Sequence, residues 1–305
     1  MYLFILGAGF TKAFCSNAPV LNTLLDEIDD VKTKKKVTEY QMKYNIKDNE
    51  ILLSMLLDDS YSFNFNEKIE RMLLSNNILT GIGKLIRGIK VDQNNSKLFK
   101  DIIENTLSCQ FNKYNKQIVS FNWDAILEDQ NIVQVDPLIS IGHNPYGKKN
   151  LEGGVIGPQI NILKLHGSIK WFKISENEPA DLSNVFAVEH DHRSLNLIID
   201  KQAPVIVPFG YSKGKFMEGN LFTVLWNKFD HLLSECEHII IMGYSFPSSD
   251  YQILMKLFNY KGKIKKVVIK EESDSEILKR LKTLFPENVI VNKDLKEINS
   301  NDLLI

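Results

Sequence analysis

The last third of the chain alternates short apolar segments with amphipathic ones, and this pattern constrains the fold most. Strands are expected at His238–Met242, Lys265–Lys270 and Asn288–Asn292, and helices at Leu221–Ser234, Ser249–Phe258 and Ser273–Leu284. Apolar strands that alternate with helices of about 10–15 residues indicate βαβ units, whose right-handed crossovers build a parallel sheet. The sequence therefore predicts an α/β fold with a Rossmann-like parallel sheet.

Similar segments occur earlier in the chain. The first six residues are almost all β-formers or large apolar residues, so we expect a first strand that is buried on both faces. Further strands are expected at Gln117–Phe121, Ile132–Val135, Asn161–Leu165 and Pro204–Pro208, with Ile169–Ile174 as a hairpin or edge strand. Short helical segments are expected at Thr11–Ser16, Val20–Ile28 and Ala125–Asp129. Residues 142–159 and 175–203 are rich in glycine or polar residues and are expected to be loops.

Residues 29–115 are expected to form a helical insertion between the first two strands of the sheet. From Glu50 to Cys109 apolar residues recur every three or four positions, as on the buried face of a helix. Residues 29–50 are polar and lysine-rich, which we interpret as a solvated helix face or loop, the alternative being a binding patch. The whole chain, residues 1–305, is then one domain that carries this insertion.

The composition excludes several classes of protein. Hydrophobic residues make up 44% of the chain, which is enough for a substantial core. The 37 basic and 38 acidic residues give no global charge that would attract nucleic acid or a membrane. No apolar run reaches the roughly 18 residues of a membrane-spanning helix, and the first residues lack the features of a signal peptide. We expect a cytoplasmic protein.

The cysteines and a histidine-rich segment give no indication of a metal site. Cys15, Cys109 and Cys236 are too few and too far apart for a disulfide framework or a four-cysteine zinc site. They fit a reducing compartment and are expected to be small buried apolar residues. Glu189-His190-Asp191-His192 looks like a metal cluster, but the ligand spacing is poor. We therefore expect no bound metal.

The first strand runs directly into a glycine turn. Gly7 and Gly9 permit a tight turn and let a phosphate approach the backbone, and Thr11 offers an N-cap hydroxyl to the helix that follows. The dinucleotide fingerprint has a third glycine three residues after Gly9, where this chain has Lys12. A plain strand-to-helix turn is therefore the alternative to an anion site.

Four of the expected strands end in glycine or polar residues. These ends are Gly7–Thr11, Asn122–Asp124, His166–Ser168 and Gly243–Ser245. Because open parallel sheets bind ligands outside the carboxyl ends of their strands, we expect the four ends to line one crevice. It would present glycine backbone, an amide, a carboxylate and an imidazole.

The motifs around these ends resemble, in the same order, those of the sirtuin-like NAD-binding superfamily. They read G-A-G-F-T at 7–11, S-F-N-W-D at 120–124, K-L-H-G-S at 164–168 and G-Y-S-F-P at 243–247. They are most similar to those of the bacterial branch found in antiphage defence proteins. The resemblance implies that the following residues bind the cofactor: Gly7, Ala8, Gly9, Phe10, Thr11, Phe14, Gly167, Gly243, Tyr244 and Ser245.

The resemblance also implies three catalytic residues. Asn122 would contact the nicotinamide ribose and orient an attacking water, and Asp124 would accept a hydrogen bond from the nicotinamide carboxamide. His166 would act as general base at the ribose hydroxyls. Cleavage of the bond between nicotinamide and ribose expels a neutral leaving group. An imidazole with a pKa of about 6.5 can accept a proton at neutral pH.

Each of these residues also has a purely structural interpretation. Asn122 has the side chain of a helix N-cap, and Asp124 would then be a first-turn acid that the helix dipole favours. A lone histidine such as His166 is more often structural than catalytic. Ser245 fits a turn, and Asp250 fits a helix start.

Two departures from the family pattern direct the prediction away from protein deacylation. Deacylases of the family carry a four-cysteine zinc module, which this chain lacks the cysteines to build. Their Phe-Gly-Glu segment finds its nearest counterpart in Phe209-Gly210-Tyr211, where tyrosine replaces the acid. Water is then the expected acceptor. In the defence branch a helical insertion commonly replaces the zinc module, and residues 29–115 fit that description.

The sequence thus predicts an NAD⁺ glycohydrolase that releases nicotinamide and ADP-ribose, uses NAD⁺ as substrate and needs no zinc. The resemblance further implies an abortive-infection role in antiphage defence, a homo-oligomer, and regulation by a partner ATPase of the DNA-translocase type. Two alternatives stay open. One is a sensor that binds NAD⁺ or ADP-ribose without cleaving it, and the other is a protein ADP-ribosyltransferase.

Overall fold

The computed structural model describes the following residues: 1–19, 21–57, 64–107, 116–129, 133–135, 160–175, 178–188, 198, 202–208, 210, 213, 217–269, 275–286 and 288–291. Its strands are β1 (Tyr2–Leu6), β2 (Lys116–Ser120), β3 (Val133–Val135), β4 (Ile160–Lys164), β5 (Trp171–Lys173), β6 (Val185–Ala187), β7 (His238–Met242), β8 (Lys266–Ile269) and β9 (Val289–Val291). Its helices are α1 (Ala8–Phe14), α2 (Leu21–Leu24), α3 (Val31–Tyr44), α4 (Asn49–Leu57), α5 (Phe65–Arg87), α6 (Ser96–Asp101), α9 (Asn220–Glu235), α10 (Tyr251–Tyr260) and α11 (Glu276–Leu284). Two short 3₁₀-helices, η1 (Gln93–Asn95) and η4 (Ser248–Asp250), and a π-helix, η2 (Ile102–Leu107), are also present.

A seven-stranded sheet in the order β3-β4-β2-β1-β7-β8-β9 forms the centre of the molecule. Every pairing in this sheet is parallel, and β1 lies between β2 and β7 in register with both. All five residues of β1 are buried, as expected for a strand covered on both faces. The α/β, Rossmann-like fold expected from the sequence is confirmed.

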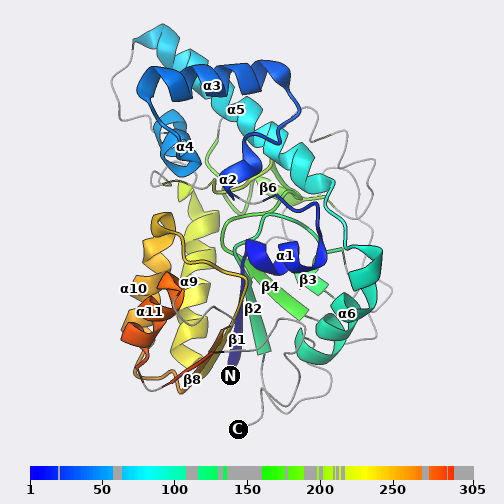
Figure 1. Cartoon of the computed structure of the whole chain (residues 1–305), viewed down its shortest axis with the longest axis vertical. Coiled ribbons are helices and arrows are strands. Elements are labelled where there is room, and N and C mark those ends of the chain that lie inside the picture. Colours follow the sequence, from blue (N-terminus) through cyan, green and yellow to red (C-terminus); the bar gives the residue numbers. More distant parts are fainter. Residues whose placement is uncertain are drawn as a thin grey trace.

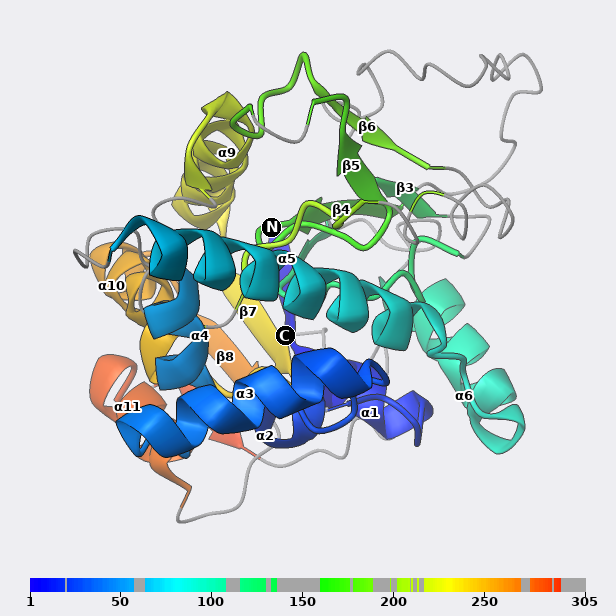
Figure 2. The same cartoon turned by 90° about the horizontal axis from the view of Figure 1, so that it is seen from above.

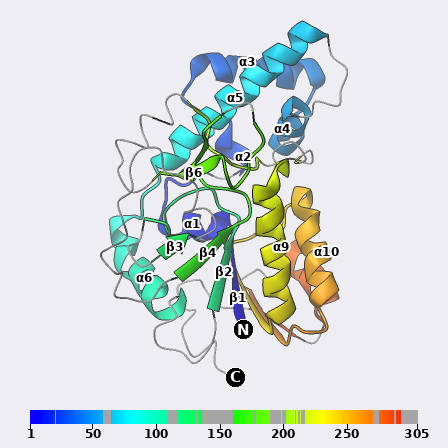
Figure 3. The same ribbon diagram turned by 180° about the vertical axis from the view of Figure 1, so that it is seen from behind.

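Helices cover both faces of the sheet (Figure 1). Leu3 and Ile5 of β1 point to one face and pack in a core cluster with apolar residues of α9, α10 and α11. Phe4 and Leu6 point to the other face, where they join residues of α1, α6 and η2. Seen from behind, α9 and α10 lie side by side on their face of the sheet (Figure 3).

A third group of helices lies over the carboxyl ends of the strands. Helices α2, α3, α4 and α5 come after β1 in the chain, and α3 and α5 lie next to each other over the sheet when the molecule is seen from above (Figure 2). Their apolar faces form a core cluster of their own, which also contains Trp123, Ala125, Ile169 and Ile206 from the loops of the sheet. These helices therefore pack directly on the loops that follow β2 and β4.

Several local expectations are corrected by the structure. The first helix begins at Ala8, so Thr11 lies inside it and Gly7 is its N-cap. Residues 125–129 form a hydrogen-bonded turn instead of a helix, in which Asp129 donates its N–H to the carbonyl of Ala125 at 2.8 Å. The helix expected within residues 29–50 is confirmed: it is α3, which Asp30 caps by accepting the N–H of Thr33 at 2.8 Å.

The segment Pro204–Pro208 is not a strand. It makes only an isolated bridge between Ile206 and Gly167, because proline at either end lacks the N–H that a ladder requires. In this bridge Val207 donates its N–H to the His166 carbonyl at 2.9 Å, and Ser168 donates its N–H to the Val205 carbonyl at 3.2 Å. Residues 171–173 do form a hairpin-like pair, with β6 as the antiparallel partner inside a region expected to be loop.

Candidate functional site

A pocket opens at the carboxyl ends of the strands, at the switch point of the sheet. The chain builds β2, β4 and β3 on one side of β1 and β7, β8 and β9 on the other, so the crossovers diverge between β1 and β7. In open α/β sheets the ligand crevice lies at this point. The pocket has a volume of about 470 Å³, within the range of small-molecule sites.

Residues from all four motifs line this pocket. The lining from the motifs comprises Ala8, Gly9, Thr11, Phe121, Asn122, Trp123, Asp124, His166, Gly243, Tyr244, Ser245 and Pro247. The remaining lining comes from Ala18, Pro19, Leu24, Ile86, Ile89 and Asp250. Residues separated by more than 200 positions in the chain thus share one cavity, whose lining is partly polar and partly apolar.

The glycines allow the turn after β1 to approach the turn after β7. Gly7 donates its N–H to the Met242 carbonyl at 3.0 Å, and Gly9 donates to the Gly243 carbonyl at 2.8 Å. A Cβ atom on Gly243 would lie 2.0 Å from the Phe10 nitrogen, and its φ of +65° also favours glycine. The glycines are therefore required for close packing between the two turns, while Ala8 and Gly9 stay exposed at the pocket.

Asn122 is held in one orientation by the turn after β1. Its Nδ2 donates to the Gly7 carbonyl at 2.9 Å and to Thr11 Oγ1 at 3.0 Å. A carbonyl can only accept, so the nitrogen must face Gly7, and Oδ1 is left as the acceptor of the amide. Asn122 does not cap a helix, since the described residues that follow it, 123–129, form irregular chain and a turn.

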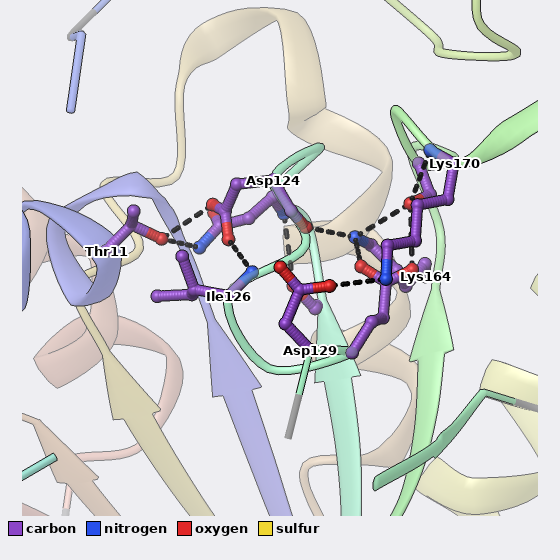
Figure 4. Close-up of polar contacts among 10 residues, drawn as sticks. Thr11, Asp124, Ile126, Asp129, Lys164 and Lys170 are labelled. Atoms are coloured by element: carbon purple, nitrogen blue, oxygen red, sulfur yellow. Dashed lines mark hydrogen bonds and ion pairs between the residues drawn. The ribbon is translucent and has the colours of Figure 1, made fainter. Parts of the chain in front are cut away.

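Thr11 joins Asn122 to Asp124. Its hydroxyl accepts from Asn122 and donates to Asp124 Oδ2 at 2.7 Å, so it is a buried bridge and not a helix cap. Asp124 Oδ1 accepts the N–H of Ile126 at 3.2 Å, as Figure 4 shows. The carboxylate is therefore anchored by a turn and by α1, and the first-turn acid of a helix is a wrong interpretation of this residue.

A buried ion pair lies behind Asp124. Lys164, the last residue of β4, donates its ammonium to Glu128 Oε2 at 2.7 Å and to the Asp124 carbonyl at 2.5 Å (Figure 4). Ser168 donates its hydroxyl to Glu128 Oε1 at 2.8 Å. The network ties the loop after β2 to the loop after β4, and so fixes Asp124 relative to His166.

His166 lines the pocket and is almost fully buried. Its ring meets Phe121 edge-on at 5.1 Å, and Phe121 stacks on Tyr244 at 4.4 Å. Burial, assisted by the positive charge of Lys213, holds the pKa of His166 well below its ordinary value. The imidazole is therefore neutral at pH 7.

Asp250 was not among the residues that the motifs assigned to the site, yet it faces His166. Its Oδ1 lies 3.5 Å from His166 Nε2 and contacts the Lys213 ammonium, and its Oδ2 accepts the Tyr244 hydroxyl at 2.5 Å. The residue stands at the start of α10, but its side chain makes no capping hydrogen bond. Its expected place at a helix start is thus confirmed, but its carboxylate bonds to Tyr244 and Lys213 instead of capping the helix.

Glu50 brings a second carboxylate from α4 to the same cluster. It accepts the Ser249 hydroxyl at 3.2 Å, and burial raises its pKa. Burial lowers the pKa of Lys213 to about 8, and the negative charge of Glu50 opposes this effect. The helices over the sheet thus contribute charge beside His166.

The other residues assigned to cofactor binding do not line the pocket. Phe10 and Phe14 are fully buried and pack with Phe99 beneath the sheet, at ring distances of 5.2 to 6.4 Å. Gly167 turns the chain after His166 with a φ of +78°. Gly7 is the N-cap of α1 and is buried. None of these four residues lines the pocket, and their role is to shape the turns that do.

Sequence reasoning missed the groups that surround the histidine and the asparagine. A lysine at the end of the apolar segment N-I-L-K-L was a usable signal for a buried ion pair, since such a strand end offers the ammonium no water. Lys213 and Asp250 gave no comparable signal, because they lie in polar segments far apart in the sequence. Only the tertiary fold brings them together.

Among the described residues, no group of three or more histidine, cysteine, aspartate or glutamate side chains could hold a metal ion. Cys15 and Cys236 are buried, as expected, and burial raises the pKa of each thiol to about 12. Cys109 and the segment 189–192 lie outside the described residues. Within the described part of the chain, no helix is both long enough and apolar enough to cross a membrane.

Comparison with known proteins adds no assignment to this site. No protein-family model matches the sequence, and no curated protein matches it at a significant level.

Proposed function

We propose that the protein is an NAD⁺ glycohydrolase that releases nicotinamide and ADP-ribose. One observation carries the proposal: the pocket at the switch point collects an oriented amide, an anchored carboxylate and a neutral buried imidazole. These are the three side chains to which the motif resemblance gives catalytic roles. Asn122 and Asp124 follow β2 and His166 follows β4, and their presence in one pocket supports a common task.

The reaction needs little more than orientation. Water attacks C1′ of the nicotinamide ribose, the bond from C1′ to the pyridinium nitrogen breaks, and its electron pair leaves with neutral nicotinamide. Asn122 Oδ1 is the acceptor that would hold the water or a ribose hydroxyl, because both N–H groups of the amide are engaged. His166 would take the proton that the water loses. A positioned base of this kind contributes about 10²–10⁴-fold to a rate.

Asp124 suits a role at the leaving group. Thr11 and Ile126 hold its carboxylate in place, and it lines the pocket. Each carboxylate oxygen can accept a further hydrogen bond, so the group can still receive the carboxamide N–H of nicotinamide. The apolar side chains of Leu24, Ile86 and Trp123 offer a surface for a flat ring.

Nicotinamide release from NAD⁺ tests the proposal directly. The full chain is incubated with NAD⁺, alone and with candidate partners, and the products are separated by chromatography. Release of nicotinamide and free ADP-ribose supports the proposal, whereas no turnover under any condition overturns it. Label transferred from NAD⁺ to protein would instead identify an ADP-ribosyltransferase.

Substitution of two site residues separates catalysis from binding. Asn122→Ala and His166→Ala are expected to lower nicotinamide release about 10²–10⁴-fold while ADP-ribose still binds in calorimetry. Unchanged cellular effects of these variants would favour a sensor that binds without cleaving. The proposal extends, on the motif resemblance, to cytoplasmic NAD⁺ depletion in antiphage defence, to a homo-oligomer and to control by a partner ATPase.

A further inference from the structure

The cluster around His166 contains charged groups that the proposed reaction has not used. Asp250 is 4% exposed and lines the pocket, although it stands at the start of a helix. Burying a carboxylate costs several kcal/mol unless partners compensate for the lost water. The fold supplies these partners from three separate segments, which indicates that the carboxylate has a task at this place.

The two oxygens of Asp250 have different partners. Oδ2 accepts the Tyr244 hydroxyl at 2.5 Å, which fixes the plane of the carboxylate. Oδ1 contacts the ammonium of Lys213 and lies 3.5 Å from Nε2 of His166. Tyr244 is itself held by its stack on Phe121, whose ring also meets His166.

The geometry points to Asp250 as the positioning residue for His166 in NAD⁺ cleavage, with Lys213 as its counter-charge; this inference rests on the proposed function. A base that must accept a proton in one direction needs a third group to orient its ring. The distance of 3.5 Å is long for a hydrogen bond, but such contacts often shorten when substrate binds. Asp250 does not take the proton, because Lys213 and Tyr244 already hold its oxygens.

Lys213 keeps this carboxylate from acting on the histidine as a bare charge. An unpaired carboxylate beside an imidazole would favour the imidazolium form. With the ammonium in contact, the carboxylate orients the ring while the ring stays neutral. The groups that face Lys213 are Asp250 from the start of α10, Glu50 from α4, and His166 after β4.

The test compares Asp250→Asn with a matched control. Asp230→Asn removes a carboxylate that pairs with Lys256 at 2.5 Å on the outer helices, away from the pocket. Asp250→Asn is expected to lower kcat for nicotinamide release about 100-fold with little change in KM, and the control to leave both unchanged. Asp250→Glu, which keeps the carboxylate, is expected to recover part of kcat.

A second measurement does not depend on turnover. With ¹⁵N-labelled histidine, the ring-nitrogen shifts of His166 are assigned by His166→Gln and followed against pH. They are expected to change in Asp250→Asn and to stay the same in Asp230→Asn. The inference is overturned if the wild type cleaves NAD⁺ but Asp250→Asn keeps full kcat. It is also overturned if the His166 shifts of Asp250→Asn are identical to those of the wild type.

The failure of the proposed function would look different. A wild-type protein that releases no nicotinamide contradicts the glycohydrolase, whatever the spectra show. A change of the His166 shifts in Asp250→Asn would then still support the positioning contact. Loss of folding in Asp250→Asn is recognised by thermal unfolding, and in that case Tyr244→Phe tests the same contact. It frees Oδ2 of Asp250, and unaltered His166 shifts in this variant would overturn the inference.

Discussion

Two buried lysine–carboxylate pairs flank the pocket, and they differ in what else the carboxylate touches. One carboxylate oxygen of Glu128 accepts a hydrogen bond from Lys164 and the other accepts one from Ser168. Neither Lys164 nor Glu128 lines the pocket. Asp250 shares one oxygen between Lys213 and the edge of His166, and it does line the pocket. A pair with all its partners inside the protein holds loops together. A pair whose carboxylate also contacts an imidazole in the pocket can affect the orientation and the protonation of that imidazole.

The exposures of the two pairs agree with this difference. The side chains of Lys164 and Glu128 are each 2% exposed, whereas that of Lys213 is 11% exposed. The first pair is enclosed beneath the loops after β2 and β4. The second lies where the helices over the sheet meet the pocket, beside Glu50 of α4.

The largest expected effect follows from breaking the enclosed pair. Lys164→Met leaves Glu128 buried without its counter-charge, which is expected to lower the free energy of unfolding by about 3–5 kcal/mol. Urea unfolding with linear extrapolation measures this loss. Removing both charges in Lys164→Met/Glu128→Met should recover most of it, because no unpaired charge then remains. If the double variant is as unstable as the single one, the loss does not come from the unpaired charge.

Breaking the bridge between Asn122 and Asp124 is expected to have a smaller effect. Thr11→Val keeps the shape of the side chain but removes the hydroxyl that accepts from Asn122 and donates to Asp124. The unfolding free energy should fall by about 1–3 kcal/mol. Nicotinamide release should fall as well, because Asn122 loses one of its two restraints.

Thr33→Val is the matched control for this variant. Thr33 is equally buried and donates its hydroxyl to Asp30, the N-cap of α3, at 2.5 Å. It should lose stability without losing kcat. Equal losses of kcat in both variants would show that general destabilisation, and not the orientation of Asn122, causes the effect.

The sequence predicted the sheet well, because apolar strands buried on both faces are unambiguous. The start of α1 was predicted wrongly, because a glycine turn gives no side-chain signal for a helix start. Gly7 is the N-cap, and the Thr11 hydroxyl donates to Asp124 instead of capping the helix. The strand expected at Pro204–Pro208 failed because the prolines remove ladder donors. Apolar composition alone does not show this.

The candidate site was predictable in part, because its position follows from the parallel sheet. Strand ends of a parallel sheet must share one edge, so the residues after β1, β2, β4 and β7 could be expected to meet. The charges around His166 could not be expected there. A serine–serine–aspartate run before a helix has the composition of a cap, and only the contacts of Asp250 with Tyr244 and Lys213 distinguish it.

The smallest effect at neutral pH is expected from Lys213→Arg, and it sharpens the comparison most. Burial lowers the pKa of Lys213 to about 8, so the ammonium loses its proton as the pH rises through 8, and Asp250 then loses its counter-charge. Nicotinamide release by the wild type should therefore fall on the basic side with an apparent pKa near 8. The guanidinium of arginine stays charged throughout this range, so the variant should lack this fall.

The shape of the pH profile decides this prediction, because arginine and lysine differ in geometry and the absolute rates need not match. At pH 7 about a tenth of the Lys213 side chains are neutral, and at pH 9 about nine tenths, so wild-type kcat should drop roughly tenfold between these values. Lys164→Arg is the control at the enclosed pair and should keep the wild-type basic limb. If Lys213→Arg shows the same basic limb as the wild type, another group titrates there, and the pair of Lys213 and Asp250 has no greater part in the chemistry than the pair of Lys164 and Glu128.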